Sequence, residues 1–428
     1  MIKELEFPNG IHLLAGWQSG DERAIARLRE IMDATIAGKY DRNFLIHPPK
    51  DRVHIAGSVN MTTLSLLHDL YRLNSKDVYR GDPERYVRTT MMTRRLLGMN
   101  KLYVSWAVYA LTAEALGQKT MYPANFPPGA DPDRPMLNRD NWHELKTPDF
   151  NSGVAKIIND TSECFGRLTG LDPILQISAP YNLAADIFGQ EPLLGSLVHD
   201  PEFANQLLDH LVDHIHRPWI DHFMARNPDG WIELSDASGS PFFIGPENCK
   251  NFSIRAIRRL KEENPWGHRV YDANFRGDYV SATKKKERRS ARKERRAPVA
   301  KVDLAELTAE KHKICEDFVI RLHDDQVPVE FYAEEAIKKN VPFFAGVGSS
   351  EVDRNGIADM DLAKSDIDTL ARHKVRQVKR VAHSIAKNGY PIRTPPWPGV
   401  LYFEDISGEA SFELIEIAIR AGLEEGAL

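Results

Sequence analysis

The sequence predicts an α/β protein that folds as a TIM (β/α)8 barrel, and three observations carry that prediction. Short β-rich runs alternate with longer amphipathic stretches, which is the pattern of βα units around a parallel sheet. Eight such runs fit into the 428-residue chain, as a barrel requires. Nearly every run turns polar at its carboxyl end, where the active sites of barrels lie. The alternative is a doubly wound open sheet, which also alternates strands and helices.

The chain is expected to form two parts. Residues 1–50 are predicted to be an N-terminal helical extension, because residues 21–38 have apolar side chains at helical spacing and end at a glycine. Residues 51–428 are predicted to be the barrel. Helical patterns, such as those at residues 200–224 and 366–389, separate its strands. The eight strands are expected at residues 52–60, 101–108, 173–180, 231–238, 269–277, 318–325, 341–350 and 391–403.

Composition and charge indicate an ordinary globular protein. Of the residues, 42% are hydrophobic and 27% are charged, and a net charge of −5 gives no general attraction to nucleic acid. No apolar run is long enough to span a membrane, and the first residues do not form a secretion signal. Three widely spaced cysteines favour a reducing compartment over a disulfide framework. We therefore expect a cytoplasmic protein.

Charged and polar side chains gather at the carboxyl ends of the fourth, fifth and sixth predicted strands. The candidate catalytic residues are Asp236, His323 and Asp324, because carboxylates that share a cavity raise one another's pKa and histidine titrates near neutrality. Either type of group can then act as a general acid. The structural alternative is an internal ion-pair network between strand ends. The candidate substrate-binding residues are Asn60, Tyr181, Asn182, Asp272, Asn274 and Arg276.

The stretch RVYDANFRGD at residues 269–278 combines a buried strand start with an acid, an amide and a guanidinium. Side chains alternate between the faces of a strand, so Asp272, Asn274 and Arg276 are predicted to point to one side. Arg276 could hold a substrate carboxylate through two parallel hydrogen bonds. Oxygen-rich clusters also bind zinc or magnesium, and the ligands of such a metal would be Glu233, Asp236 and His323.

A run of lysines and arginines at residues 284–296 follows the fifth predicted strand. It is expected to be an insertion on the face that carries the active site. A solvated loop is the common fate of such a run. A docking patch for an acidic protein or an anionic cofactor is the functional alternative. Nucleic-acid binding is disfavoured because no aromatic residues are interleaved for base stacking.

Three stretches resemble the uroporphyrinogen decarboxylase superfamily. They read ILQISAPYNLAADIFGQEPLLGSLVHDPEFANQLLDHLVDHI, GWIELSDASGSPFFIGPENCKNF and FAGVGSSEVDRNG. The resemblance extends from about Asp51 to the C-terminus and implies a TIM barrel.

Within that superfamily, the chain is closest in character to the corrinoid-dependent methyltransferases. The decarboxylases carry an R-Q-A-G-R-type stretch and a Y-L-P-E-Y-like run near their start, where this chain reads DRVHIAGSVNMTT. Members that methylate coenzyme M hold zinc through a His-x-Cys pair and a distant cysteine. If FRGD aligns with the Gly-Asp after that pair, the ligand positions fall on Asn274 and Arg276, which are not zinc ligands. The stretch PIRTPPWPGVLYF also lacks the distant cysteine.

The resemblance therefore implies an enzyme that removes a methyl group from a small methylated substrate, either a methyl ether such as an aromatic methoxy compound or a methylamine. Its methyl acceptor would be cob(I)alamin on a partner corrinoid protein, and zinc is not supported by a His-x-Cys site. One alternative is a decarboxylase or lyase acting on a tetrapyrrole or aromatic carboxylic acid. Another is a non-catalytic, partner-binding barrel. The sequence leaves the methyl donor, a bound metal and the oligomeric state open.

Overall fold

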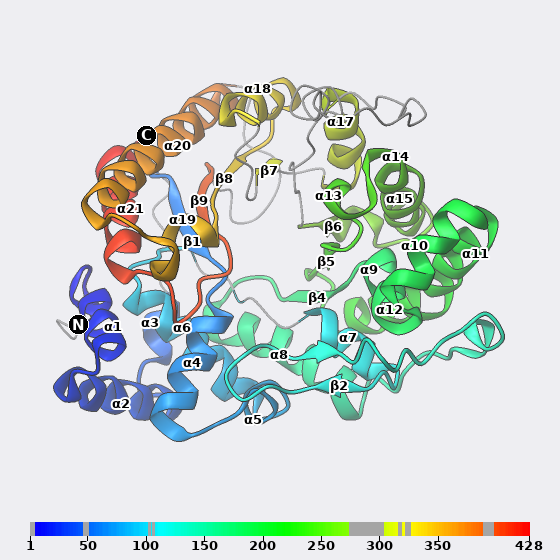
Figure 1. Cartoon of the computed structure of the whole chain (residues 1–428), viewed down its shortest axis with the longest axis horizontal. Helices are drawn as coiled ribbons and strands as arrows, with labels where there is room; N and C mark the ends of the chain where they lie inside the picture. The colour runs from blue at the N-terminus through cyan, green and yellow to red at the C-terminus, as the bar shows by residue number, and fades with distance from the viewer. Residues whose placement is uncertain are drawn as a thin grey trace.

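The computed structural model places seven parallel strands in two sheets that face each other across the middle of the molecule, with helices outside them (Figure 1). It describes residues 5–45, 51–101, 104, 108–273, 304–315, 319–321, 327–387 and 398–428. One sheet has the order β4 (Ile174–Ser178), β5 (Trp231–Ser235) and β6 (Val270–Asp272). The other has the order β1 (His54–Gly57), β9 (Val400–Phe403), β8 (Phe343–Val347) and β7 (Val319–Arg321). The fold is thus α/β with parallel sheets, as the sequence predicts.

The first and last strands of the chain lie side by side. β1 pairs with β9 in parallel from His54–Val400 to Gly57–Phe403. The segment that follows β1 continues the arrangement, because the Lys101 amide donates to the carbonyl of Ile55 at 2.9 Å. An antiparallel hairpin of β2 (Thr120–Met121) and β3 (Gly129–Ala130) lies apart from both sheets.

The strands are shorter than the sequence predicts, because their polar carboxyl ends leave the sheet and begin helices. Asn60 begins α4 (Asn60–Tyr71), Pro180 begins α9 (Pro180–Phe188) and Ser349 begins α19 (Ser349–Val352). Val108, predicted to end the second strand, begins α7 (Val108–Ala115). The basic run at residues 284–296 lies outside the described residues.

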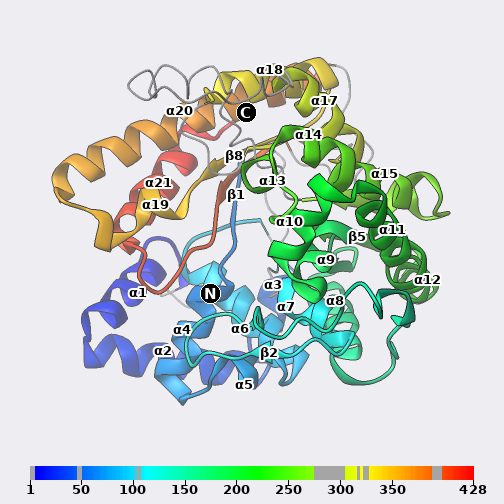
Figure 2. The same ribbon diagram turned by 45° about the vertical axis from the view of Figure 1, so that its right-hand side comes forward.

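Helices form the outer layer of the molecule (Figures 1 and 2). Before β4 these are α5 (Ser75–Tyr79), α6 (Pro83–Leu96) and α8 (Gly153–Thr169). Between β4 and β6 they are α10 (Gln190–His199), α11 (Pro201–Leu211), α12 (Arg217–Arg226), α13 (Pro241–Ile244), α14 (Pro246–Asn248) and α15 (Arg255–Glu262). The later helices are α17 (Leu304–Cys315), α18 (Val329–Lys339), α20 (Met360–Ala386) and α21 (Phe412–Glu425).

Residues 5–45 form α1 (Asn9–Ser19), α2 (Glu22–Ile36) and the short α3 (Asp41–Phe44). Asp21 caps α2 by accepting a hydrogen bond from the Arg23 amide at 2.9 Å. α1 and α2 pack on α6, and α1 also packs on α21. The buried side chains Leu14, Leu28 and Met32 join the same hydrophobic core as the strands, so these helices form a further layer against α6 and α21.

The predicted helix at residues 200–224 is divided into α11, a π-helical turn η3 (Val212–His216) and α12. Pro218 has no N–H, so the carbonyl of His214 cannot accept the usual hydrogen bond from the residue four positions later. That carbonyl accepts from Thr147 Oγ1 at 2.6 Å. The widened turn brings the His216 ring within 2.9 Å of the Ser178 carbonyl, at the end of β4.

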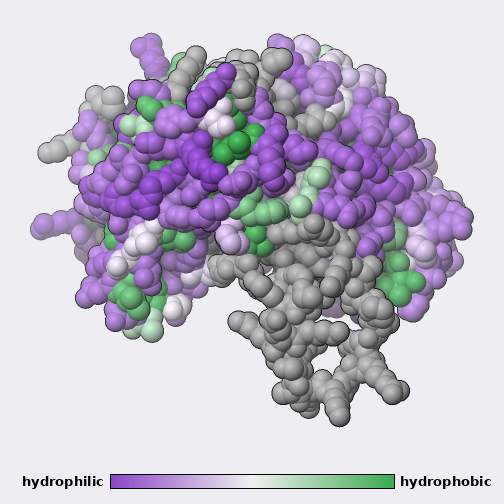
Figure 3. Space-filling model, turned by 90° about the horizontal axis from the view of Figure 1, so that it is seen from above, coloured by the Kyte–Doolittle hydropathy of each residue, from purple (hydrophilic) through white to green (hydrophobic). Residues whose placement is uncertain are grey.

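No helix among the described residues is both long enough and apolar enough to cross a membrane. The face seen from above carries mostly hydrophilic side chains, with hydrophobic ones in small separate patches (Figure 3).

Candidate functional site

Three polar side chains form one layer on the inner face of the β4–β5–β6 sheet. Gln176, Glu233 and Tyr271 lie in register on neighbouring strands, so their side chains point to the same face. The Tyr271 hydroxyl donates to Glu233 Oε2 at 2.7 Å, and Gln176 Nε2 donates to Glu233 Oε1 at 3.1 Å. Both carboxylate oxygens are thereby fixed in position by neutral donors.

This layer faces the opposite sheet. The Tyr402 hydroxyl of β9 lies close enough to Glu233 to be influenced by its charge. Burial raises the pKa of Tyr402 well above its usual value, the charges of Asp405, Glu233 and Glu404 raise it further, and buried Arg94 opposes them. Phenol and carboxyl groups of the two sheets therefore lie near each other.

Asp272 points the other way, toward the helices. It lies next to Tyr271 on β6 and in register with Leu234, so its side chain leaves the sheet on the outer face. There its Oδ2 meets Lys311 Nζ of α17 at 3.3 Å, and both side chains are buried. The Cys315 thiol donates to the Asp272 carbonyl at 3.1 Å. The predicted substrate-binding role of Asp272 stays a prediction, and the contacts seen tie β6 to α17.

Asp236 is enclosed between the sheet and the helices. Its Oδ1 accepts from the Gly239 amide at 3.1 Å, and its Oδ2 accepts from the Ser253 hydroxyl of η4 (Cys249–Ile254). A Cβ on Gly239 would lie 2.1 Å from Asp236 Oδ2, so only glycine fits there. Burial and the charge of Asp272 raise the pKa of Asp236 to about 6. The carboxyl has no exposed surface, and its contacts hold the loop after β5; its predicted catalytic role stays a prediction.

Tyr181 and Asn182 lie in the first turn of α9, directly after β4. Pro180 starts this helix and Gly189, with φ 99°, ends it. Asn182 Oδ1 accepts from the Ser238 amide at 3.1 Å, while its Nδ2 donates to Asp186 Oδ2 at 3.0 Å. Asn182 therefore joins the loop after β5 to a carboxyl on α9.

Three buried hydroxyls at this edge have no hydrogen-bond partner among the residues that the structure describes. They belong to Ser178, Tyr181 and Ser240. Burial, and next the charge of Asp236, raises the pKa of Tyr181. Buried hydroxyls without partners are costly, so their presence together at the ends of β4 and β5 indicates a place for water or a polar ligand.

Asn60 belongs to a different network. Its Oδ1 accepts from Ser58 Oγ at 2.9 Å, and its Nδ2 donates to the Tyr79 hydroxyl at 3.3 Å. These residues follow β1, on the sheet opposite Asp236. The structure therefore brings Tyr181, Asn182 and Asp236 together, and places Asn60 apart from them.

Four predicted site residues lie outside the described residues: Asn274, Arg276, His323 and Asp324. Their roles stay predictions. Among the described residues, no three His, Cys, Asp or Glu side chains are arranged to hold a metal ion. Glu233 and Asp236, two of the suggested metal ligands, have different surroundings. Glu233 bonds to Gln176 and Tyr271 of the neighbouring strands, whereas Asp236, which follows β5, bonds to Gly239 and to Ser253 of η4.

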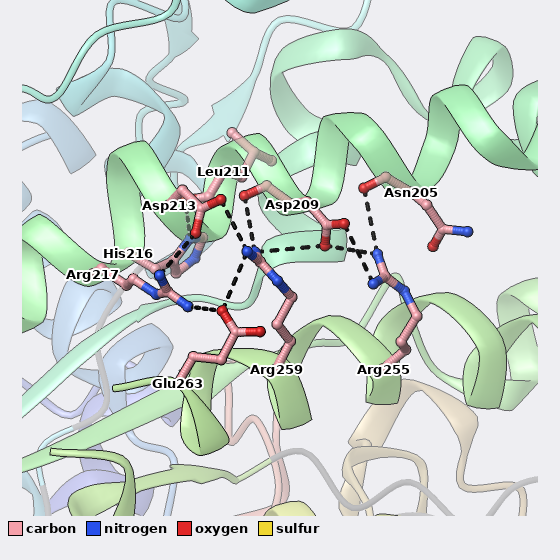
Figure 4. A network of polar contacts seen from close by, with 9 residues as sticks. All are labelled: Asn205, Asp209, Leu211, Asp213, His216, Arg217, Arg255, Arg259 and Glu263. Carbon is pink, nitrogen blue, oxygen red and sulfur yellow. Dashed lines mark hydrogen bonds and ion pairs between the residues drawn. The ribbon is translucent and has the colours of Figure 1, made fainter. Parts of the chain in front are cut away.

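A second charged region lies on the outside of the same strands (Figure 4). Asp209 of α11 and Asp213 of η3 face Arg255 and Arg259 of α15, with Arg255–Asp209 at 2.8 Å and Arg259–Asp213 at 3.0 Å. Arg217 joins Asp213 at 3.1 Å, and Glu263 pairs with both Arg217 and Arg259. Every carboxylate in this outer network has at least one arginine, so its contribution is to hold the helices together.

Sequence reasoning missed Asp186 and Lys311. Asp186 is a single acid among Leu183, Ala184, Ala185, Ile187 and Phe188, and an acid in so apolar a helix is a usable signal. Lys311 occurs in AEKHKIC, which looks like an ordinary helix surface, so no local signal marks it as buried.

No protein-family model matches the sequence, and no curated protein matches it. Among solved structures, a methyltransferase from Methanosarcina mazei matches with a TM-score of 0.60 and 13% identity, over 91% of this chain and 96% of that chain. The chain shares the fold of that methyltransferase. The match spans almost the whole of both chains, so it includes the strands that carry the site.

Proposed function

We propose that this protein is a methyltransferase that removes a methyl group from a small methylated substrate, an ether or an amine, and passes it to cob(I)alamin on a partner corrinoid protein. The observation that carries the proposal is the polar layer of Gln176, Glu233 and Tyr271 inside a fold shared end to end with a methyltransferase. The corrinoid acceptor comes from the sequence resemblance, in which this chain lacks the zinc ligands of thiol-methylating members.

The proposal includes a closed eight-stranded barrel, with an N-terminal helical extension and a basic insertion. Three contacts support closure. β1 pairs with β9, Lys101 pairs with β1, and Gln176 Nε2 donates to the Val104 carbonyl at 2.7 Å. Residues 101 and 104 thus link β1 to β4, where a second barrel strand would lie. The order β7–β8–β9–β1 also follows the chain around a ring, without the reversal of a doubly wound sheet.

The residues of this chain would bind and orient the substrate while the partner supplies the nucleophile. Cob(I)alamin is a strong nucleophile, so the main tasks are to align the methyl group and to help its leaving atom depart. Glu233, fixed by Tyr271 and Gln176, would position the substrate between the sheets. Asp236 would hold the loop after β5. Arg276 and Asn274 keep their proposed role in substrate binding, and His323 and Asp324 remain candidates for the acid.

The assay is methyl transfer from a panel of methylated ethers and amines to cob(I)alamin, followed by the absorbance change to methylcob(III)alamin. We expect at least one compound to support turnover that depends on the protein. Tyr271→Phe removes the bond to Glu233 and should lower kcat/KM about tenfold, equivalent to about 1.4 kcal/mol.

The matched control is Tyr71→Phe. Tyr71 of α4 donates to the Asp33 carboxylate of α2 at 2.7 Å, and both residues lie far from the site in the sequence. This variant should keep the wild-type rate. If no compound in the panel supports methyl transfer at any concentration of cob(I)alamin, the proposed function is contradicted.

A further inference from the structure

We propose that Asp186 is the proton donor of this site and that the methyl donor is an ether, whose departing oxygen takes the proton. The inference rests on the proposed function and deepens it. Asp186 has a position, a free oxygen and surroundings that fit this task better than those of the other described acids.

Its position is set by α9. Asn182 donates to Asp186 Oδ2 at 3.0 Å and accepts from the Ser238 amide at 3.1 Å. Ser238 follows β5, so these contacts place Asp186 at the edge where the parallel strands β4 and β5 end. This is the edge at which barrel enzymes assemble their sites. The unpartnered hydroxyls of Ser178, Tyr181 and Ser240 lie on the same two connections.

Asp186 also has a free oxygen. Its Oδ2 is tied to Asn182, whereas Oδ1 has no hydrogen-bond partner among the described residues. The residue is partly exposed, although its neighbours on α9 are buried. Asp236, by contrast, has both oxygens engaged and no exposed surface. Of the two carboxyls, only Asp186 is free to reach a ligand.

The surroundings of Asp186 keep the proton on the carboxyl. No cation pairs with it among the residues described, and burial raises its pKa to about 7 against the bond from Asn182. The charged groups on the helices packed against α9 are engaged elsewhere or exposed. The ion-paired ones are Glu114 with Arg80, Asp209 with Arg255, Arg259 with Asp213, Arg258 with Glu310, and Lys250 with Glu306. Lys261 donates to the Gly267 carbonyl, and the His210 ring bonds to the Leu145 carbonyl. The exposed ones are Glu191, His199, Glu202 and Glu262.

The reaction balances with this proton. The bond between methyl carbon and ether oxygen breaks, and its electron pair goes to oxygen. Cob(I)alamin provides the pair for the new carbon–cobalt bond, and cobalt goes from the +1 to the +3 state. The Asp186 proton goes to the oxygen, so an alcohol or phenol leaves, and solvent reprotonates the carboxylate. A methylated ammonium group, whose nitrogen is quaternary or already protonated, loses its methyl group as a neutral amine and needs no further proton. An ether oxygen does need one, which is why an ether fits the site.

The test compares wild type with Asp186→Asn, using free cob(I)alamin and a series of ring-substituted methoxybenzenes. Loss of a general acid should lower kcat by about 10²–10⁴-fold for ethers whose phenols are weak acids. Ethers whose phenols are strong acids should lose far less, because their oxygen departs without a proton. The wild-type rate should fall above pH 7, and this fall should be missing in Asp186→Asn.

The matched control is Asp172→Asn. Asp172 precedes β4, at the opposite end of the strand; burial also raises its pKa, and it accepts one hydrogen bond, from Trp231, at 3.3 Å. This variant should retain the wild-type rate and pH profile. A variant that merely misfolds would lose activity equally with all ethers, and Asp186→Glu, which keeps the acid, should recover part of the rate.

The outcomes separate the two proposals. If wild type demethylates ethers and Asp186→Asn does so with an unchanged pH profile and leaving-group dependence, the role of Asp186 is refuted and the methyltransferase stands. If wild type transfers methyl groups only from amines, the ether assignment is refuted. If it transfers none, both proposals are overturned.

Discussion

Two regions of the molecule contain the same types of charged side chain, but they differ in how many of the acids are paired with a cation. The outer network between α11, η3, α12 and α15 gives every carboxylate an arginine (Figure 4). The region at the ends of β4, β5 and β6, called the inner region because it lies between the sheet and the surrounding helices, holds Asp186, Asp236 and Asp272. Among the described residues, its one ion pair joins Lys311 to Asp272. The inner region has too few cations for its acids.

The difference separates a structural role from a chemical one. Outer pairs are partly exposed, so water screens them and each is worth little. Asp186 and Asp236 have no ion-pair partner among the described residues, and their removal from water costs stability and raises the pKa of both carboxyls. Such an arrangement is costly unless protonated carboxyls serve a function.

The largest effect is expected from Lys311→Met. The change removes the described ion-pair partner of the buried Asp272 carboxylate, and we expect a loss of about 3–5 kcal/mol in the free energy of unfolding at pH 8. Urea unfolding at pH 8 measures it. A matched control is Lys364→Met, which breaks a partly exposed pair with Glu413 at 2.7 Å and should cost less than about 1 kcal/mol. Equal losses in the two variants would erase the distinction between inner and outer pairs.

A smaller effect of opposite sign is expected from Asp186→Asn. The pKa of Asp186 is higher in the folded state than in the unfolded chain. As the pH rises, the unfolded chain therefore loses this proton at a lower pH than the folded protein does. The free energy of unfolding falls as the pH rises from about 4 to about 7. Replacing the acid should therefore stabilise the protein by about 1–3 kcal/mol at pH 8 and leave it unchanged at pH 4. Thermal unfolding at both pH values gives the answer. Destabilisation at pH 8 would mean that the carboxylate has a structural partner.

The smallest effect is expected from Arg259→Gln in the outer network. The guanidinium is about a quarter exposed and shares its partners with Arg217 and Arg255. We expect a loss of about 0.5–1 kcal/mol at low salt, less at high salt, and no change in methyl transfer. A loss above 2 kcal/mol that is insensitive to salt would show that the outer network is as tightly coupled as the inner region.

Much of the fold follows from the sequence, because it depends on local features. These are the spacing of apolar residues and the prolines and glycines at which helices begin and end. Alternating β-rich and amphipathic runs, with Pro180 and Gly189 around α9, predict the strands and helices that the structure contains. The strand ends were harder to place, since a polar residue after a strand can equally begin a helix, as Asn60 does. The π-helical turn at η3 has a local cause in Pro218, but the group that bonds to the freed His214 carbonyl, the Thr147 hydroxyl, is distant in the chain and no local pattern reveals it.

The site was predicted only in part. The sequence located the edge where Tyr181, Asn182 and Asp236 meet, because parallel strands end together. It did not show that Asp236 and Asp272 turn toward the helices while Glu233 turns inward, since that depends on the register of β4, β5 and β6. It also gave no reason to bury Lys311, whose partner Asp272 is 39 positions away in the chain.

The central claim is that Asp186 carries a proton near neutrality in the folded protein. Carbon NMR of aspartate carboxyls, compared between wild type and Asp186→Asn, measures this directly. We predict one carboxyl signal that titrates at about pH 7 in wild type and is missing in the variant. If the carboxyl whose signal is missing in the variant is already ionised at pH 5 in wild type, the account of Asp186 is contradicted.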